Sequence, residues 1–145
     1  IVRDRPSDLG TPVSVNFDNK LELIGVRMPP SVDRGQTFEL TLIFEVKQRL
    51  RRNWDIFVHF DGAGQRFQGD HKPAEKFCAA SQWRPGDYIV DTVKIEAGGL
   101  GYPKTDYRMF VGLFTGSAGN WTNMKVITPG ADEANRFPVG VLRIK

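Results

Sequence analysis

The stretch N-W-D-I-F-V-H-F-D-G-A-G-Q-R-F-Q-G-D-H, residues 53–71, decides the fold class of this protein. Across residues 54–60 the apolar side chains of Trp54, Ile56, Val58 and Phe60 alternate with those of Asp55, Phe57 and His59. This is the period-two pattern of a β-strand. Asp61-Gly62 then favours a turn, because glycine tolerates a positive φ and aspartate hydrogen-bonds to its own turn. We expect residues 67–71 to return as a second strand, so that the hairpin carries both histidines of the chain.

The same alternation recurs along the chain, most clearly in residues 37–46. One face of that strand is apolar, whereas the other is mostly polar, as in an antiparallel sheet with one wet side. Its apolar face consists of Phe38, Leu40, Leu42, Phe44 and Val46. Gly25 indicates a bulge or a close backbone approach within another strand. The further strands are expected at residues 13–17, 21–28, 88–95, 106–114, 121–127 and 137–144.

Turn signals separate these strands and favour a sandwich. In W-R-P-G-D, residues 83–87, proline presets the first central position of a type II turn and Gly86 supplies the positive φ of the second. Residues 73–82 lack the strand pattern and contain helix formers, which allows at most one short helix. We therefore predict an all-β, antiparallel Ig-like or jelly-roll sandwich of about eight or nine strands. Residues 1–12 are expected to form a linker or arm, and residues 13–145 a single domain.

Composition is that of an ordinary globular domain. The 145 residues are 40% hydrophobic and 26% charged, which suits a chain that folds around its own hydrophobic core. The longest apolar runs are only a few residues, so no membrane span is expected in this sequence. The net charge of +3 is spread along the chain, and no zinc-finger or RNA-binding spacing appears, so we expect no nucleic-acid partner. The single cysteine, Cys78, excludes an internal disulfide and is expected to be an inert buried thiol.

Six segments, taken in order, carry a resemblance to a known kind of domain. They are F-D-N-K-L-E-L-I-G-V (17–26), R-G-Q-T-F-E-L-T-L (34–42), D-I-F-V-H-F-D (55–61), G-D-H (69–71), W-R-P-G-D (83–87) and Y-R-M-F-V-G-L-F (107–114). Their order resembles an uncharacterised bacterial β-sandwich domain that is appended, outside the cytoplasm, to multi-spanning glycosyltransferase-like and other envelope proteins. The resemblance implies an Ig-like sandwich with a non-catalytic accessory role. The chain departs from that pattern in residues 72–82 and after Asn120.

Both histidines fall in the only cluster that resembles a polar site. His59 and Asp61 project from one face of their strand, but Asp61 is better explained by the turn with Gly62. Asp70 and His71 are adjacent and should point to opposite faces. We interpret His59 and Asp70 as a structural pair that ties the hairpin, with a solvated pair without a role as the alternative. Imidazole and carboxylate also bind divalent metals, so a metal-dependent enzyme that uses His59 and Asp70 is a further alternative.

No catalytic motif accompanies these residues. Ser81, Ser117 and Cys78 lack the local setting of an activated nucleophile, and Asp87 and Asp91 are expected to be solvated. We therefore predict that the protein is not an enzyme and needs no metal or cofactor.

One basic run stands out, formed by Lys47, Arg49, Arg51 and Arg52. Such a run can hold phosphate, an anionic lipid or an acidic glycan. The simpler interpretation is a solvated loop between two strands.

Aromatic side chains give the stronger signal for binding. Five of them fall at turns or on strand faces opposite the expected core: Trp83, Tyr88, Trp121, Tyr102 and Phe57. Flat aromatic rings stack on the C–H faces of sugars and on other apolar partners, although the same rings can serve as core or as lids. We therefore predict an accessory module that binds a glycan or another small ligand. A purely structural or protein-interaction domain, with a protein of the cell envelope as partner, is the alternative.

Overall fold

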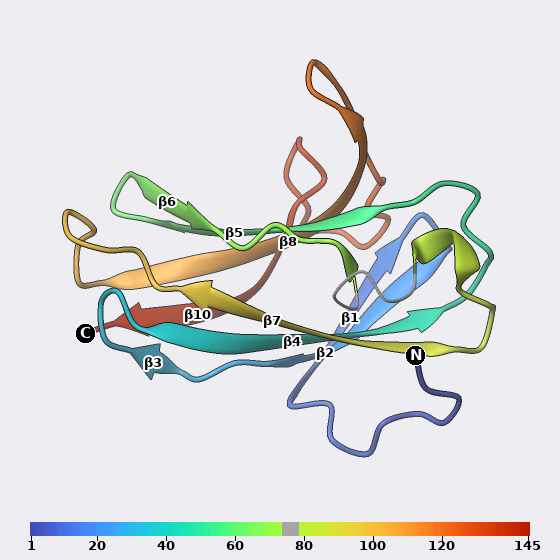
Figure 1. Cartoon of the computed structure of the whole chain (residues 1–145), viewed down its shortest axis with the longest axis horizontal. Helices are drawn as coiled ribbons and strands as arrows, with labels where there is room; N and C mark the ends of the chain where they lie inside the picture. The colour runs from blue at the N-terminus through green and yellow to red at the C-terminus, as the bar shows by residue number, and fades with distance from the viewer. Residues whose placement is uncertain (74–78) are drawn as a thin grey trace.

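The computed structural model describes residues 1–73 and 79–145 and shows two β-sheets packed as a sandwich (Figure 1). The four-stranded sheet contains, in spatial order, β1 (Thr11–Phe17), β2 (Leu21–Arg27), β4 (Thr37–Val46) and β7 (Tyr88–Glu96). The six-stranded sheet contains β3 (Ser31–Val32), β10 (Phe137–Ile144), β8 (Asp106–Ser117), β5 (Asp55–Gly62) and β6 (Gln65–Gln68), with β9 (Asn120–Asn123) paired to β8. The predicted all-β sandwich is confirmed.

Strand positions follow the expectations closely where the alternation is strong. β4 spans residues 37–46, as predicted, whereas β1 begins at Thr11, two residues early. Pro12 fits there because β1 is an edge strand, on which a missing backbone donor costs little. Val2 also forms a bridge with Tyr88, so part of the expected arm lies against the four-stranded sheet. The two-residue β3 was not expected, since two residues show no period.

The hairpin of β5 and β6 turns two residues later than expected. Ala63 and Gly64 have φ values of 48° and 75°, and this pair forms the loop between the two strands. Asp61 and Gly62 remain in β5, so the predicted turn at these residues is wrong. A side chain at position 62 would crowd Asp106 and Tyr107 of the neighbouring strand, which explains a glycine within the ladder. The second strand ends at Gln68 rather than at residue 71.

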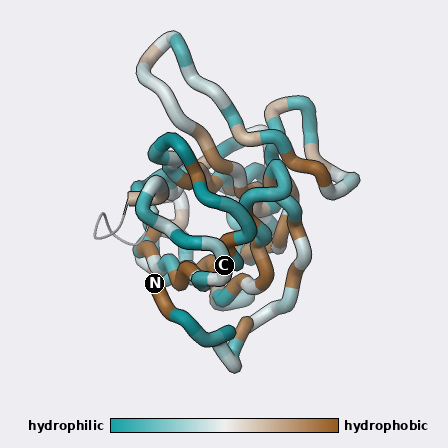
Figure 2. Tube along the Cα trace, turned by 90° about the vertical axis from the view of Figure 1, so that its right-hand side faces the viewer, coloured by the Kyte–Doolittle hydropathy of each residue, from teal (hydrophilic) through white to brown (hydrophobic). Residues whose placement is uncertain are grey.

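Among the described residues, one hydrophobic cluster lies between the sheets. Figure 2 marks the hydrophobic residues along the Cα trace in brown. Leu40, Leu42 and Phe44 of β4 are fully buried and belong to the same cluster as Ile56, Val58 and Phe60 of β5. This packing confirms the predicted apolar face of residues 37–46.

Tyr107 anchors the start of β8 within the core. The side chain is fully buried, and its hydroxyl donates a hydrogen bond to the backbone oxygen of Pro103 over 2.7 Å. This tyrosine corner satisfies the one polar atom that the aromatic side chain brings into the core. Burial also raises the pKa of Tyr107, so the hydroxyl retains its proton.

Two further local predictions are confirmed. The register of β2 against β4 shifts between Leu23 and Gly25, and a Cβ on Gly25 would collide with the backbone of Leu9, so Gly25 marks both a bulge and a close approach. Gly86 has a φ of 90° in the turn of residues 84–87. A short 3-10 helix, η2 (Ala80–Gln82), lies in the expected helical region. Residues 74–78 of that region, which include Cys78, lie outside the described residues.

We expect Leu42→Ala to lower the free energy of unfolding by roughly 2–5 kcal/mol, because the leucine is fully buried between the sheets. Denaturant titration at 25 °C measures this change. Glu39→Ala, at an exposed position of the same strand, is the matched control and should change stability by less than about 0.5 kcal/mol. Similar losses for the two variants would contradict the assigned faces of β4.

A candidate ligand-binding groove on the six-stranded sheet

A groove of about 670 Å³ lies on the face of the six-stranded sheet that points away from the core. Because Ile56, Val58 and Phe60 face the core, the intervening residues Phe57 and His59 face outward and line the groove. The β8–β9 hairpin rises from the sheet beside it (Figure 1). The segment from Asp132 to Arg136 lines the groove as well, so strands and loops far apart in the sequence build one site.

The aromatic part of the groove depends on a glycine. Gly112 of β8 pairs with Phe57 of β5, and a Cβ at position 112 would overlap the Phe57 ring. The glycine therefore lets this ring lie across the neighbouring strand. Phe57 contacts Phe114, with ring centroids 6.1 Å apart, and Phe114 meets Trp121 edge to face at 5.3 Å. Trp121 is 56% exposed and presents an indole ring at the groove.

Arg136 holds one wall of the groove against the sheet. Its guanidinium lies over the Phe110 ring at 4.2 Å and donates hydrogen bonds to Asp132 (2.7 Å) and Asp61 (3.0 Å). Burial alone would lower the pKa of Arg136, but these two carboxylates raise it above its ordinary value. The guanidinium is therefore a fixed charge that ties the loop before β10 to β5 and β8.

Asp61 also forms an ion pair with a second arginine, Arg66 of β6. Arg66 donates to its two oxygens over 2.7 and 3.1 Å, in the fork geometry that suits guanidinium and carboxylate. Burial alone would raise the pKa of Asp61, but the hydrogen bonds from Arg66 and Arg136 hold it below its usual range. The role of Asp61 is thus to bind two guanidinium groups rather than to form a turn.

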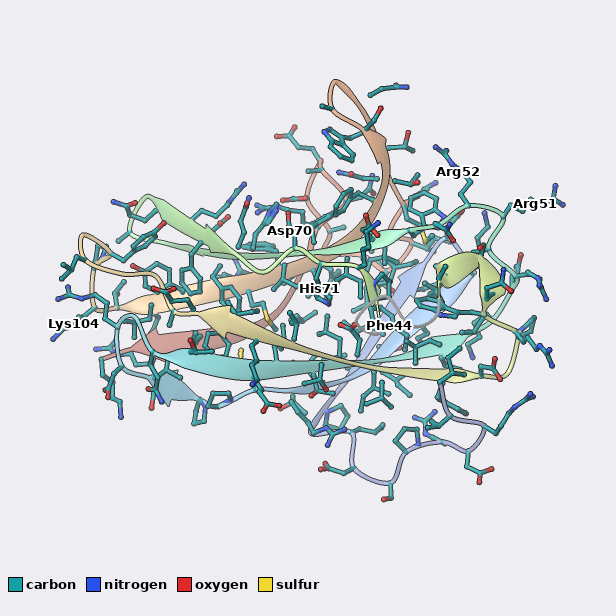
Figure 3. The ribbon with its side chains drawn as sticks, viewed as in Figure 1. Phe44, Arg51, Arg52, Asp70, His71 and Lys104 are labelled. Carbon is teal, nitrogen blue, oxygen red and sulfur yellow. The ribbon has the colours of Figure 1, made fainter. Side chains whose placement is uncertain are left out.

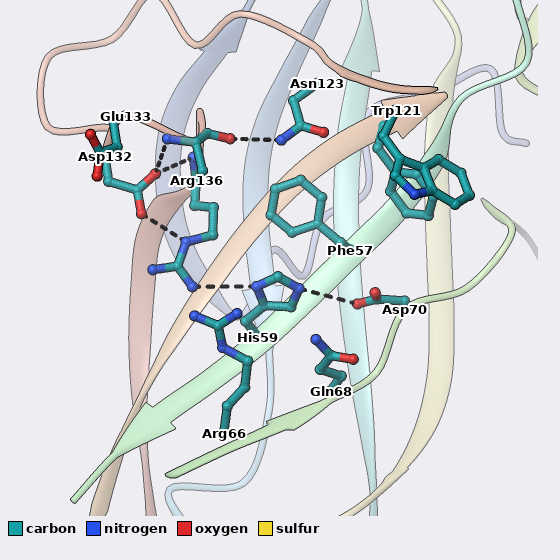
Figure 4. Close-up of a pocket in the computed structure, with 12 residues that line it drawn as sticks. Phe57, His59, Arg66, Gln68, Asp70, Trp121, Asn123, Asp132, Glu133 and Arg136 are labelled. Atoms are coloured by element: carbon teal, nitrogen blue, oxygen red, sulfur yellow. Dashed lines mark hydrogen bonds and ion pairs between the residues drawn. The ribbon is translucent and has the colours of Figure 1, made fainter. Parts of the chain in front are cut away.

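His59 lies between Arg136 and Asp70 (Figure 4). Its Nε2 is 3.7 Å from Oδ1 of Asp70, and its Nδ1 is 3.3 Å from the Arg136 guanidinium. Asp70 Oδ1 also accepts the backbone N–H of Val58 at 3.0 Å, so the expected pair of His59 and Asp70 is brought together next to the edge of β5. A guanidinium beside the imidazole repels a metal cation. Within residues 1–73 and 79–145, no three His, Cys, Asp or Glu side chains gather as a metal site would require.

His71 turns away from the groove and joins the two sheets. Its Nδ1 donates to the Gly69 backbone oxygen (2.7 Å), and its Nε2 lies 2.5 Å from Oδ2 of Asp91 on β7. Asp91 is fully buried, so the expectation that it is solvated is wrong. A side chain at Gly69 would collide with Ile95, so the glycine allows the two sheet edges to approach. The G-D-H motif therefore closes this edge of the sandwich.

Asp87 is also buried, which contradicts the expectation that it is solvated. Its carboxylate accepts the backbone N–H of Arg84 at 3.1 Å, within the turn of residues 84–87. Both buried aspartates therefore have structural partners, which leaves neither of them as an open catalytic acid.

Only two of the five aromatic candidates line the groove. Trp121 is exposed there, and Phe57 forms part of the lining although it is mostly buried. Trp83 is fully buried in the core, which corrects its placement among exposed aromatics: the residue before the turn packs between the sheets. Tyr102 is occupied by a hydrogen bond to the Arg66 backbone oxygen (3.0 Å), and Tyr88 pairs with the N-terminal segment.

Several groove residues carried no signal in the sequence. Gln68, Asn123, Asp132, Glu133 and Arg136 stand in no recognisable motif, and tertiary folding alone brings them to the outer face of β5. Arg136 lies 77 positions from His59, too far for any local pattern to connect the two.

The sequence matches no protein-family model, and no curated protein is similar to it. In the part of the chain that the structure describes, no helix combines the length and the apolar character needed to cross a membrane. A proposal about function therefore depends on the geometry of the groove.

We expect stability to fall as the pH rises above about 6.5. Burial alone would lower the pKa of His71, but the hydrogen bond with Asp91 raises it above 6.5 in the folded protein. Protonated His71 stabilises the fold fully below the pKa that it has in the unfolded chain, and this stabilisation is lost as the pH rises through its pKa in the folded protein. Each pH unit between these two pKa values corresponds to about 1.4 kcal/mol. Urea denaturation at pH 6 and pH 9 measures it.

His71→Gln should remove this part of the pH dependence, whereas His59→Gln, at the other histidine, should keep it. An unchanged dependence in His71→Gln would show that a different group is responsible.

Proposed function

We propose that this protein is a non-catalytic accessory module that binds a glycan in the groove on its six-stranded sheet. The observation that carries the proposal is the exposed indole of Trp121 at a groove of about 670 Å³ that also contains polar side chains. Aromatic faces stack on the C–H faces of sugar rings, while polar groups at fixed positions bind the hydroxyls. This arrangement suits a ligand that is apolar on one face and polar at its edges.

The polar side chains complement the indole. Gln68 and Asn123 line the same groove, and the Asn123 amide is oriented by a hydrogen bond from its Nδ2 to the Ala134 backbone oxygen over 3.0 Å. That bond leaves the Asn123 carbonyl as an acceptor for a hydroxyl. A groove with one oriented amide, one exposed amide and one indole offers both kinds of contact that a sugar needs.

The strand order favours an Ig-like sandwich over a jelly roll. In Ig domains strands C, F and G share one sheet and strand E lies next to strand B. Here β5, β8 and β10 are neighbours in the six-stranded sheet, as strands C, F and G are in an Ig domain. In the other sheet β7 pairs with β4, as strand E pairs with strand B. We assign β2, β4, β5, β7, β8 and β10 to strands A, B, C, E, F and G, and the tyrosine corner on β8 supports the assignment.

The sequence resemblance supports an accessory role outside the cytoplasm. On this proposal the groove binds a glycan of the cell envelope and positions a larger parent protein near it. A purely structural domain would not need the exposed indole in a groove. A metal-dependent reaction at His59 and Asp70 is disfavoured by the guanidinium of Arg136 at the imidazole.

We expect Trp121→Ala to weaken glycan binding at least tenfold, which corresponds to about 1.4 kcal/mol. A glycan array selects the bound sugar, and titration with that sugar then gives the affinity. The two other tryptophans, Trp54 and Trp83, are buried, so a change of tryptophan fluorescence on binding reports chiefly on Trp121.

Leu100→Ala serves as the control, because Leu100 is 94% exposed and does not line the groove. Equal affinities for wild type, Trp121→Ala and Leu100→Ala would overturn glycan binding at this groove. Circular dichroism verifies that both variants retain the sheet structure.

A further inference from the structure

The cationic groups of the groove are already neutralised by the protein itself. Arg66 and Arg136 share Asp61, and Arg136 also pairs with Asp132. Guanidinium groups recognise carboxylate and phosphate through paired N–H donors, and one such pair on Arg66 is directed at Asp61. The carboxylates of Asp61 and Asp132 together balance the charges of the two guanidinium groups. An acidic ligand would therefore meet cations whose charge the protein already offsets.

The acidic groups of the groove outnumber the basic ones. Three carboxylates line it, those of Asp70, Asp132 and Glu133, against the two guanidinium groups of Arg66 and Arg136. The difference is one negative charge. Beside the groove, the charge of Asp61 is matched by that of Arg108, its partner in the register of β5 and β8.

Several of the polar atoms that remain open to a ligand are acceptors. Within the described chain the carboxylate of Glu133 is exposed and has no partner, and Asp70 uses only one of its oxygens. The carbonyl of Asn123 is likewise open, since the amide nitrogen is the atom that bonds to Ala134. Acceptors of this kind suit the hydroxyl and ammonium groups of a ligand and repel its anionic groups.

We propose that the groove selects neutral and amino-bearing sugar units and discriminates against units that carry carboxylate, sulfate or phosphate. This inference rests on the proposed glycan-binding function and adds its charge selectivity. Glu133 is a specificity-determining residue in this scheme, because among the described residues that line the groove it is the carboxylate without an ion pair to an arginine or a histidine.

The basic run does not offset this selectivity. Arg51 and Arg52 project from the loop between β4 and β5 at one end of the sandwich, and none of the run lines the groove (Figure 3). An acidic glycan attracted to that loop would therefore meet a different surface from the one that contains Trp121.

The test is a glycan array that carries neutral, amino-sugar and acidic glycans, probed with wild type at low ionic strength. We expect neutral and amino sugars to bind and acidic ones to bind weakly or not at all. The preference should shrink at 0.5 M NaCl, where charges are screened within a few ångströms.

Glu133→Lys, which changes the groove by two charges, should raise binding of acidic glycans relative to neutral ones by about three- to tenfold. Glu39→Lys makes the same change on the exposed face of β4, in the other sheet, and should leave that ratio unaltered.

The outcomes separate the two proposals. If wild type binds no glycan on the array, the proposed function fails and the selectivity fails with it. If wild type binds acidic glycans best through Trp121, the function stands and the selectivity is overturned. An equal effect of Glu133→Lys and Glu39→Lys would also overturn it, because net charge rather than the groove would then set the preference.

Discussion

The alternation of side chains along β5 is the constraint on which the rest of this structure depends. Because Ile56, Val58 and Phe60 are committed to the core, Phe57 and His59 have to face outward. A shift of register by one residue would exchange the two sets and destroy the core and the groove together. Stability and the candidate site are therefore set by the same strand, which explains why the groove lies over β5 and the strands beside it.

The outer face of the six-stranded sheet carries two arginines, and the protein balances their charges with its own carboxylates. Arg66 and Arg136 both bind Asp61, and Arg136 also lies against the Phe110 ring. Arginine suits this position because its planar group can stack on a ring and bind carboxylates at the same time. The outcome is a surface with many charges and few free cations, which is the basis for the expected preference among sugars.

The sequence predicted the sandwich because its strongest signals are local. Along residues 37–46 apolar side chains alternate with mostly polar ones without interruption, and β4 has the predicted bounds. The sequence placed the hairpin turn two residues too early, because two adjacent pairs that contain glycine are both suitable for a turn. Asp61-Gly62 is paired with β6 in the structure, and Ala63-Gly64 forms the loop. Period and turn chemistry identify strands, but they do not rank two adjacent turn candidates.

The groove was only partly predictable, because its polar residues meet through long-range folding. His59 with Asp70 belongs to one hairpin region and was expected, whereas Arg136 reaches His59 and Asp61 across more than 70 positions. The burial of Trp83 shows the same limit. A tryptophan before a turn has the same local sequence whether it packs inward or projects outward, and only the opposite sheet decides.

The loop that carries Asp132 and Arg136 is ordered by its own contacts. Asp132 accepts hydrogen bonds from the backbone of Ala134 and Arg136, and Asn123 binds the loop from β9. The conformational entropy of this loop is thus lost when the chain folds rather than when a ligand arrives. Binding of the proposed glycan would then need no closure of this loop, and its rate would be governed by diffusion and orientation.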